Sequence, residues 1–412
     1  MPVRQAVQEV LIPNSQHSDW LSKEQLNSIT PEILVERMKA LAPLVADNAR
    51  EAERLRRPVD DVWSAIRKTG VLYHFVPKKY GGLEFDIGTF IDAVLPVAEG
   101  CASTAWVTAF CMEHNYLLAN FPEEAQEEIF SQFPYITAPG TLYPPGNAVA
   151  AQGGYRLTGR WKWGTGVMHS DWIMVGAMAA QEGGDPELRF FLMPTSEVAV
   201  LDTWYVDGMV GTGSNDILIN NLFVPEHRTL AVAALRSGTA WGPKLHGSWI
   251  FQVSMPVLLA LTAAIASLGG ARRSVRYLEE RLVGGDPKLT ERPAAHMRLG
   301  TARLETHSAE SIMRAVGHRV EAIAKSGVPA TLAQRVEMRA QICYAVELCR
   351  TAVRRISEIA GSGSHSLDNP VQRFARDLNV ISTHALLEWD GASEAYGRSL
   401  IGLAPNSMVD GK

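Results

Sequence analysis

GYRLTGRWKWGTGVMHSDWIMVGA, residues 154–177, is the stretch from which the fold of this chain is inferred. It has the composition of two β-strands, yet it holds three tryptophans, a basic pair and a Gly-Thr-Gly turn. A tryptophan is costly to expose, and its indole N–H needs a partner when it is buried. The spacing therefore predicts a flat apolar surface on a β-domain, and this surface should meet a partner group.

The sequence on either side of this stretch has a different pattern. Residues 30–130 show helical periodicity, and Thr30 and Pro31 suit the N-cap and first position of a helix. Short runs rich in Val, Ile, Trp and Phe, separated by Gly, Asp and Pro, favour strands over residues 140–225. Helical segments return around 253–282, 290–325, 332–360 and 371–390. The predicted order is an N-terminal helical domain (1–135), a central barrel or sandwich (136–235) and a C-terminal four-helix bundle (236–412).

Composition excludes several classes of function. The 412 residues are 46% hydrophobic and 20% charged, which allows two or three domains with their own cores. The net charge of -5 and the lack of an aromatic-interleaved basic run argue against nucleic acid. The longest apolar run, 255–271, is too short to span a bilayer and is expected to be a buried helix. With no export signal visible, we expect a cytoplasmic protein without membrane contact.

Metal and nicotinamide sites are not indicated either. The four cysteines lack zinc spacing, and the histidines form no HExxH pair, so no metal is expected. Two turns, GTGSND at 211–216 and GSGSHS at 361–366, begin like a dinucleotide fingerprint. Neither has the third glycine, and the first leads into a strand rather than a helix.

Two histidines are candidates for chemistry, each with an ordinary alternative. Asn369 and Pro370 open a predicted helix over 371–390, on which His384 shares a polar stripe with Arg373, Asp377, Ile381 and Glu388. A stripe that faces solvent would be ordinary surface, whereas one that faces a cleft would tune the imidazole pKa. Taken alone, His114 in CMEHNYLLANFP suits a satisfied core histidine as well as a catalytic one.

The three-part order, with GRWKWGTGVMHSDW (159–172) and GMVGTGSNDILINNLFVPEHR (208–228), resembles the acyl-CoA dehydrogenase superfamily over nearly the whole chain. Its closest resemblance is to the oxygenase components of two-component flavin-dependent monooxygenases, called group D. The resemblance implies an α+β fold with a small β-barrel between the helical domains. It also implies that Trp163 and Thr165 meet the isoalloxazine ring of FMN or FAD, while Gly164 and Gly166 let the backbone approach it closely.

The run NPVQRFARDLNVISTHALLEWDGASEAYGRSLIG (369–402) resembles the closing helices of group D enzymes. There the family pattern is an Arg, an Asp and then a His, which correspond here to Arg373 or Arg376, Asp377 and His384. The resemblance implies that His384 lies near the reactive edge of the flavin and that Arg373 and Arg376 are cofactor-binding residues. It makes His114 a substrate-facing histidine. Thr141, in APGTLYPPGNAVA (138–150), would be a hydroxyl on the substrate side. The lack of an acidic residue in that segment argues against an acyl-CoA dehydrogenase.

The function that the resemblance implies is hydroxylation of a phenol- or indole-like aromatic molecule. The enzyme would use O2 and reduced FMN or FAD supplied by a separate reductase, and it would assemble as a homotetramer. One alternative is an FAD-dependent dehydrogenase or oxidase, of the acyl-CoA dehydrogenase or nitroalkane oxidase type, in which Asp390 is the base. Asp390 would otherwise cap the following helix. A second alternative is a non-catalytic partner protein that keeps only the fold.

Overall fold

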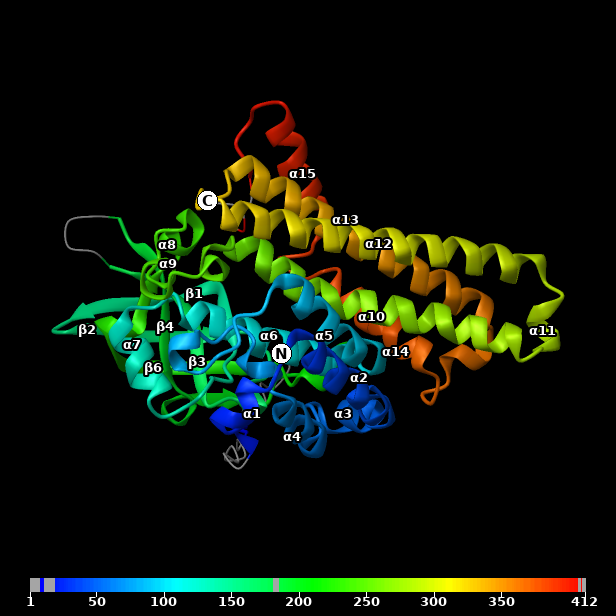
Figure 1. Cartoon of the computed structure of the whole chain (residues 1–412), viewed down its shortest axis with the longest axis horizontal. Coiled ribbons are helices and arrows are strands. Elements are labelled where there is room, and N and C mark those ends of the chain that lie inside the picture. Colours follow the sequence, from blue (N-terminus) through cyan, green and yellow to red (C-terminus); the bar gives the residue numbers. More distant parts are fainter. Residues whose placement is uncertain (1–7, 11–18, 181–184, 407–408, 410–412) are drawn as a thin grey trace, which may run out of the picture.

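A computed structural model describes residues 8–10, 19–180, 185–406 and 409 of the chain. The order of its elements is helices, then strands, then helices, as the sequence predicts (Figure 1). The N-terminal helices are α1 (Lys23–Asn27), α2 (Pro31–Asp47), α3 (Ala49–Leu55), α4 (Asp60–Thr69), α5 (Ile87–Gly100), α6 (Ala102–Leu118) and α7 (Glu123–Phe130). The C-terminal helices are α8 (Val232–Ser237), α9 (Gly242–His246), α10 (Met255–Val283), α11 (Pro287–Thr290), α12 (Pro293–Lys325), α13 (Leu332–Ala360), α14 (Pro370–Ile381) and α15 (Trp389–Leu400).

The strands form one seven-stranded mixed sheet in the order β5-β6-β2-β1-β3-β4-β7. They are β1 (Gly140–Ala151), β2 (Gly154–Trp161), β3 (Trp172–Ala179), β4 (Glu187–Pro194), β5 (Ala199–Leu201), β6 (Asp216–Pro225) and β7 (Thr229–Ala231). Strands β1 and β3 are parallel, and the other pairs are antiparallel. Within the described residues the sheet is open, so the predicted barrel is not closed. The two edge strands, β5 and β7, are short, with three residues each.

Two helix starts follow from capping chemistry. Thr30 Oγ1 accepts from the N–H of Ile33 at 3.3 Å, and Asn369 Oδ1 accepts from the N–H of Val371 at 2.9 Å. Each cap side chain bonds a backbone N–H of the first helical turn that has no partner within the helix. Both predicted helix N-termini are confirmed. The predicted end of the second helix is wrong, because α14 stops at Ile381 instead of residue 390. Ser382 and Thr383 follow, and their hydroxyls donate to the carbonyls of Asn379 and Val380. These side-chain bonds take up carbonyls that a longer helix would use for its backbone hydrogen bonds.

The three tryptophans of the 154–177 stretch have three different environments. Trp161 is fully buried in the core of the sheet, where its Nε1 donates to Gly176 O at 2.7 Å. Trp172 is buried against the helical domain, edge-on to Phe133. Trp163 alone is largely exposed, at 62%. The predicted three-tryptophan surface is therefore wrong, and one exposed ring remains for a partner.

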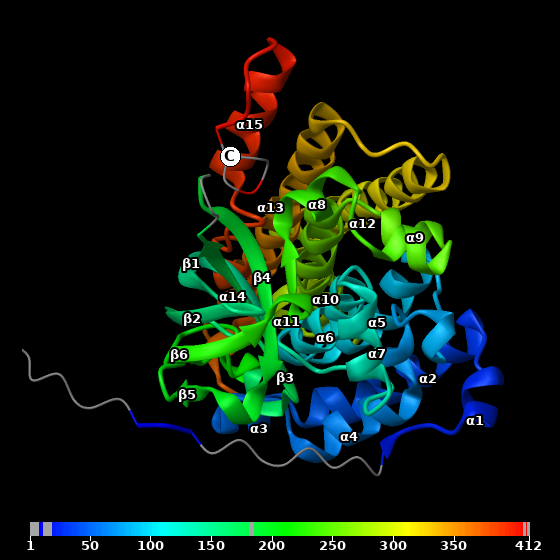
Figure 2. The ribbon, with the colours of Figure 1, turned by 90° about the vertical axis from the view of Figure 1, so that its left-hand side faces the viewer.

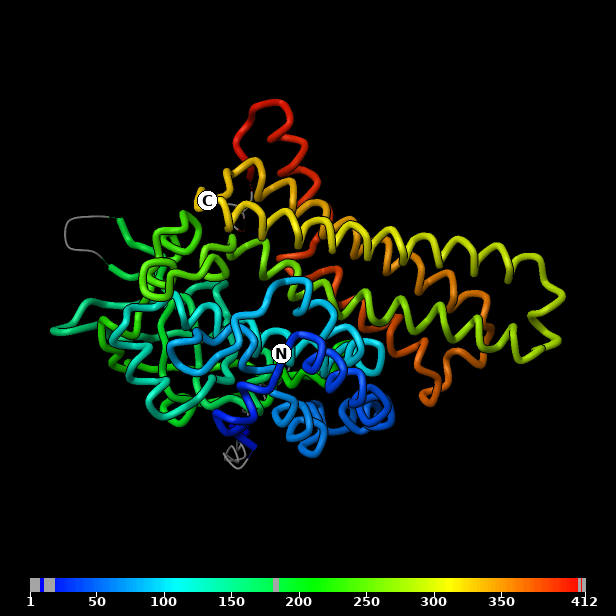
Figure 3. The backbone as a smooth tube through the Cα atoms, in the orientation of Figure 1, coloured from blue at the N-terminus to red at the C-terminus, as the bar shows by residue number. Residues whose placement is uncertain are grey.

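Three long helices, α10, α12 and α13, run side by side away from the sheet (Figure 1). Helix α10 also packs on α5, and at Gly269 a Cβ atom would lie 2.3 Å from Ala98 Cβ, so a glycine is required there. One window of α10 is apolar and long enough to cross a membrane, yet 89% of it is buried inside the structure, as in a core helix. The N-terminal helices lie beside the sheet in Figure 2, and α15 projects from the body in Figure 3.

Candidate active site

A cavity of about 170 Å³ lies where the start of β1, the loop after β2, helix α6, the start of α10 and the turn after α14 meet. Five of the residues singled out in the sequence line it: His114, Thr141, Trp163, Thr165 and His384. Much of the remaining wall is apolar or aromatic, and includes Phe110, Leu117, Leu142, Phe190, Met255, Pro256 and Leu259. An apolar wall with a few convergent polar groups is typical of a small-molecule site.

The loop that carries Trp163 has a strained conformation. Trp163 has φ = 68°, in the left-handed region that a bulky residue seldom occupies. The loop is held there by two backbone hydrogen bonds, from Gly164 N–H to Asn215 O at 2.9 Å and from Gly166 N–H to Thr212 O at 3.3 Å. A strained, well-anchored and exposed aromatic residue at a cavity is typical of a binding site.

Thr165 is tied to both neighbouring elements. Its Oγ1 accepts a hydrogen bond from Trp106 Nε1 on α6 at 3.3 Å and lies 3.2 Å from Ser214 Oγ in the segment before β6. The ring of Trp106 in turn stands edge-on to His384, with centroids 5.4 Å apart. Trp106 thus connects the hydroxyl on one side of the cavity with the imidazole on the other.

His114 presents a lone pair to the cavity. Its Nδ1 lies 2.6 Å from Ala138 O, and because a carbonyl only accepts, Nδ1 carries the proton. Burial lowers the pKa of His114 to about 4, so the ring is neutral and Nε2 is an acceptor. This buried Nε2 has no hydrogen-bond partner in the protein. An unsatisfied buried acceptor at a cavity wall indicates a ligand that donates to it.

Glu113 lies beside His114 and is fully buried. Neither of its carboxyl oxygens has a hydrogen-bond partner, and Oε2 is 3.5 Å from His114 Nε2. Burial raises the pKa of Glu113 well above its ordinary value, so the side chain is a neutral acid. His114 and Glu113 therefore form a neutral pair behind the cavity wall.

His384 has the opposite tautomer to His114. The N–H of Leu386 donates to His384 Nδ1 at 3.3 Å, so in the neutral ring Nε2 carries the proton. Burial lowers the pKa of His384 to about 4, which keeps the ring neutral at physiological pH. The cavity therefore has one imidazole acceptor, His114 Nε2, and one imidazole that carries a proton on Nε2, His384.

The other predicted site residues lie elsewhere. Arg376 binds Glu53 at 2.7 Å, and Asp377 accepts from the N–H of Met209 at 2.6 Å, so both anchor α14 to neighbouring segments. Arg373 is buried, and its guanidinium lies 5.8 Å from the ring centroid of Phe374. Asp390 is exposed in the first turn of α15, where Glu388 is the N-cap. None of these four residues lines the cavity with Trp163.

The residues present fit a flavin ring system. The exposed Trp163 ring offers a flat apolar surface for stacking, and Thr165 offers a hydroxyl to a ring heteroatom. Gly166, with φ = 75°, has its Cα close to α6, where a Cβ would lie 3.0 Å from Val107 Cγ1. The loop could not pack so closely with a larger residue. Trp163 and Thr165 line the cavity, and Gly164 and Gly166 allow the loop between and after them to pack against its neighbours.

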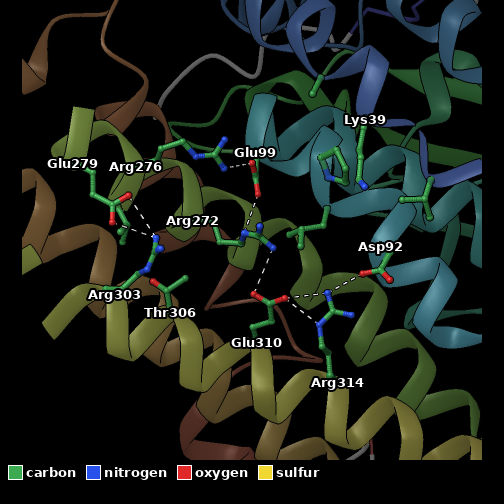
Figure 4. A pocket seen from close by; sticks show the side chains of 15 residues that line it. Lys39, Asp92, Glu99, Arg272, Arg276, Glu279, Arg303, Thr306, Glu310 and Arg314 are labelled. Atoms are coloured by element: carbon green, nitrogen blue, oxygen red, sulfur yellow. Dashed lines mark hydrogen bonds and ion pairs between the residues drawn. The ribbon is translucent and has the colours of Figure 1, made fainter. Parts of the chain in front are cut away.

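A larger hollow, of about 900 Å³, lies between α2, α5, α10 and α12, but its charges are paired with one another. Figure 4 shows Arg272 between Glu99 and Glu310 and Arg314 between Glu310 and Asp92. Arg303 likewise pairs with Glu279 at 3.3 Å. Such pairs leave little charge to attract a ligand, so the hollow is not the candidate site.

No group of three or more His, Cys, Asp or Glu side chains gathers as a metal site would among the described residues. The four cysteines are buried thiols, at Cys101, Cys111, Cys343 and Cys349. The cavity itself is lined by histidines, hydroxyls and aromatic rings, together with two cationic side chains, Lys162 and Arg236.

Sequence analysis missed several residues of the site: Trp106, Phe110, Glu113, Gly140 and Ser214. One signal could have revealed Ser214. The tripeptide Gly-Thr-Gly occurs at 164–166, after β2, and at 211–213, before β6. Because β2 and β6 pair antiparallel, with Trp161 opposite Ile217, the two tripeptides must adjoin.

Comparisons with known proteins identify the family of this chain. Residues 34–131 match the family model described as acyl-CoA dehydrogenase, N-terminal domain, and residues 261–389 match the C-terminal domain of the same family. A pigment production hydroxylase of a Rhodococcus species is 35% identical over 91% of this chain and 98% of its own length. The oxygenase component of an FADH2-dependent resorcinol hydroxylase of a Rhizobium species is 30% identical over 91% of this chain and 95% of its own. The solved structure of XiaF from a Streptomyces species, in complex with FADH2 and glycerol, has a TM-score of 0.85 at 30% identity, over 91% of this chain and 96% of that one.

Proposed function

This chain belongs to the acyl-CoA dehydrogenase superfamily, in its branch of flavin-dependent hydroxylases, and we propose that it is the oxygenase component of a two-component flavin-dependent monooxygenase. It takes reduced FMN or FAD from a separate reductase and uses O2 to hydroxylate a phenol- or indole-like aromatic molecule. The observation that carries this proposal is the cavity that joins an exposed Trp163, the Thr165 hydroxyl and two neutral histidines within an apolar wall.

Trp163, Thr165 and the glycines beside them hold the flavin. When bound, the reduced flavin supplies two electrons and the site at which O2 is activated. The chain supplies the surroundings. Trp163 stacks on the ring, Thr165 bonds a ring heteroatom, and the apolar side chains of the wall keep water out.

The two histidines have different proton roles. The lone pair of His114 Nε2 accepts the hydrogen of a substrate O–H or N–H and so raises the electron density of the aromatic ring. The N–H of His384 Nε2 donates to oxygen at the reacting centre. Thr141 lies on β1 next to Gly140, which abuts His114, and its hydroxyl is placed to contact the same substrate.

The cavity volume is compatible with a small aromatic substrate. An apolar cavity of roughly 150 Å³ in another protein accommodates benzene, and this one measures about 170 Å³.

The alternative, a dehydrogenase or oxidase with Asp390 as base, has less support. Asp390 is exposed in α15 and does not line the cavity. A base must come within hydrogen-bond reach of the proton that it removes. Arg376 would support the flavin only indirectly, through its anchoring of α14 to Glu53, and Arg373 would do so as a buried residue of the same helix.

We further infer the domain boundaries, the helix bundle, the oligomeric state and the location of the protein. The domains are 1–135, 136–235 and 236–412, and α10, α12, α13 and α14 form the core of a four-helix bundle. This bundle is the platform of a homotetramer in the cytoplasm. Analytical ultracentrifugation of the full chain tests the tetramer, and a stable monomer would contradict it.

The function is tested by flavin binding followed by turnover. The full chain is titrated without oxygen with reduced and with oxidised FMN and FAD. A flavin reductase, NADH, air and a panel of phenols and indoles are then added, and product and hydrogen peroxide are quantified. We expect reduced flavin to bind and at least one phenol or indole to gain one oxygen atom. Purification with tightly held oxidised FAD and oxidation of a C–H acid without oxygen insertion would favour the Asp390 alternative. Failure to bind any flavin would favour a non-catalytic protein.

A further inference from the structure

A row of hydroxyl groups leads from the cavity into the protein. Thr165 Oγ1 lies 3.2 Å from Ser214 Oγ, and Ser214 Oγ lies 2.8 Å from Thr212 Oγ1. Thr212 Oγ1 ends the row with a hydrogen bond to Met209 O at 2.9 Å. Ser214 and Thr212 are buried, at 2% and 1% exposure, and neither lines the cavity. They can act on a ligand only through Thr165.

The end of the row sets its direction. Met209 O is a carbonyl and can only accept, so Thr212 donates to it. The single hydroxyl proton of Thr212 is then used, and Ser214 must donate to Thr212. Ser214 in turn must accept from Thr165. In this direction all three hydroxyl protons are used within the protein. In the opposite direction Met209 O keeps its bonds from Thr212 N–H at 3.1 Å and Trp204 Nε1 at 3.2 Å but loses the hydroxyl donor, and the last proton turns into the cavity.

Met209 itself is fixed by a further buried contact. Its N–H donates to Asp377 on α14 at 2.6 Å, and its O also accepts from Trp204 Nε1 at 3.2 Å. Met209 has φ = 55°, a strained conformation for a residue with a side chain, and the hydrogen bonds hold it there. The acceptor that sets the direction of the row is therefore a rigid one.

Trp106 completes the environment of Thr165. Its Nε1–H donates to Thr165 Oγ1 at 3.3 Å and occupies one of the two lone pairs of that oxygen. The proton of Thr165 is directed to Ser214. One lone pair is left for the cavity, so Thr165 accepts a hydrogen bond from a ligand but does not donate one.

We propose that Ser214 and Thr212 are positioning residues that make Thr165 an acceptor and thereby make the site prefer reduced over oxidised flavin. This inference rests on the proposed function. The central ring nitrogen N5 carries a hydrogen in reduced flavin and none in oxidised flavin. A hydroxyl oxygen that only accepts can bond the N5–H of reduced flavin. In oxidised flavin it faces the lone pair of N5, and the two repel each other. Such a preference suits an enzyme that must take reduced flavin from a reductase and release the oxidised product.

The size of the effect is about one hydrogen bond. To donate to oxidised N5, Thr165 must reverse the row, and the Met209 carbonyl then loses its hydroxyl donor. One neutral hydrogen bond corresponds to about a tenfold change in the ratio of the two dissociation constants at most. For a two-electron couple, a tenfold change in that ratio is about 30 mV in the midpoint potential of the bound flavin.

The test compares the binding of the two redox forms of FMN to the wild type, Ser214→Ala and Thr212→Val in the full-length protein. Dissociation constants are measured by anaerobic titration, and the midpoint potential of the bound flavin gives the same ratio independently. In Ser214→Ala the Thr165 proton loses its acceptor and is free to turn into the cavity. In Thr212→Val the proton of Ser214 turns toward Thr165. We expect both variants to lower the preference for reduced FMN by about three- to tenfold.

Ser274→Ala is the matched control, since Ser274 is equally buried but donates to Gly270 O within α10. It should leave the ratio unchanged. A ratio within twofold of wild type in both Ser214→Ala and Thr212→Val, with flavin still bound, would overturn the inference and leave the proposed function intact. If the wild type binds neither redox form, the proposed function itself fails. Thermal melting of each variant shows that the protein is folded.

Discussion

Trp106 stands edge-on to His384, with ring centroids 5.4 Å apart, while its indole N–H bonds Thr165 Oγ1 at 3.3 Å. One buried side chain on α6 therefore contacts both Thr165, which we propose meets the flavin, and His384, which we propose meets oxygen. The two functions of Trp106 use different parts of the ring, the N–H and the edge. They can be separated by substitution.

Trp106→Phe removes the N–H and keeps an aromatic edge near His384. We expect reduced FMN to bind up to about fivefold more weakly, because Thr165 loses the donor that fixes its hydroxyl oxygen, while the yield of product per flavin oxidised stays high. Trp106→Ala should impair both. Anaerobic titration gives the binding, and product and peroxide assays give the yield. An equal loss of yield in both variants would show that the aromatic edge does not position His384.

His384→Ala should leave flavin binding largely intact and divert oxygen into hydrogen peroxide. We propose that the neutral ring donates a hydrogen bond from its Nε2–H to oxygen at the reacting centre, and the loss of that bond should lower the ratio of product to peroxide by about fivefold. The measurement is the ratio of product to peroxide at saturating phenol. His384→Gln, which can still donate, is the matched variant and should recover part of the ratio. Wild-type product yield from His384→Ala would rule out this role.

The pH dependence of hydroxylation tests His114. Burial lowers its pKa to about 4, so the neutral ring that accepts a proton persists as the pH falls and is lost only near pH 4. Between pH 5.5 and 8 the substrate-dependent step should show no loss of rate with a midpoint near 6.5. Single-turnover measurements with reduced flavin bound give this rate. If the rate instead fell with a midpoint near pH 6.5, and this fall disappeared in His114→Asn, the His114 imidazole would have its ordinary pKa. It would then be exposed to water in the active enzyme.

Gly140→Ala tests the position of His114 without replacing it. A Cβ at Gly140 would lie 2.5 Å from His114 Nε2, so the methyl group must push the ring away from its place at the cavity wall. We expect phenol hydroxylation to fall at least about tenfold, because a small displacement of a catalytic group has a large cost. Flavin binding should be preserved. Gly300→Ala is the control, since nothing lies within 4 Å of a Cβ there, and alanine in an exposed helix should be neutral or slightly stabilising.

The elements that could be predicted from the sequence are those set by local chemistry. Thr30 and Asn369 are capping residues, and strands β3, β4 and β6 are β-branched or aromatic runs between turn residues. The end of α14 could not be predicted, because its polar stripe continues in the sequence while Ser382 and Thr383 bond the helix carbonyls. The open sheet also depends on long-range pairing that periodicity does not contain.

The site was predictable only in part, for a related reason. Trp161 and Trp163 are two residues apart and would share one face of a continuous strand. Trp161 is buried and Trp163 exposed because β2 ends at Trp161 and Trp163 has a left-handed conformation. The resemblance to a family singled out Thr165, His114 and His384, which line one cavity. Ser214, Trp106 and Glu113 are distant from Thr165 or His384 in sequence and become partners only through tertiary packing.

Glu113→Gln should make the protein more stable at neutral pH than the wild type. The folded pKa of Glu113 is raised, so the folded state holds this proton more tightly than the unfolded state. Its stability contribution is therefore present below about pH 4.3, the pKa of an unfolded glutamate, and is lost as the pH rises. Each pH unit between the unfolded and folded pKa values costs the wild type up to about 1.4 kcal/mol, and glutamine, which cannot ionise, avoids this cost.

Urea unfolding of the wild type and of Glu113→Gln, at the same protein concentration and at several pH values from 4.5 to 8, measures the difference in the free energy of unfolding. The free energies of unfolding should be similar at the acid end and diverge in favour of Glu113→Gln as the pH rises. Glu36→Gln, an exposed carboxylate on α2, is the control and should show no such divergence. A variant that loses stability toward neutral pH would instead mean that Glu113 ionises and shares a proton with His114, 3.5 Å away.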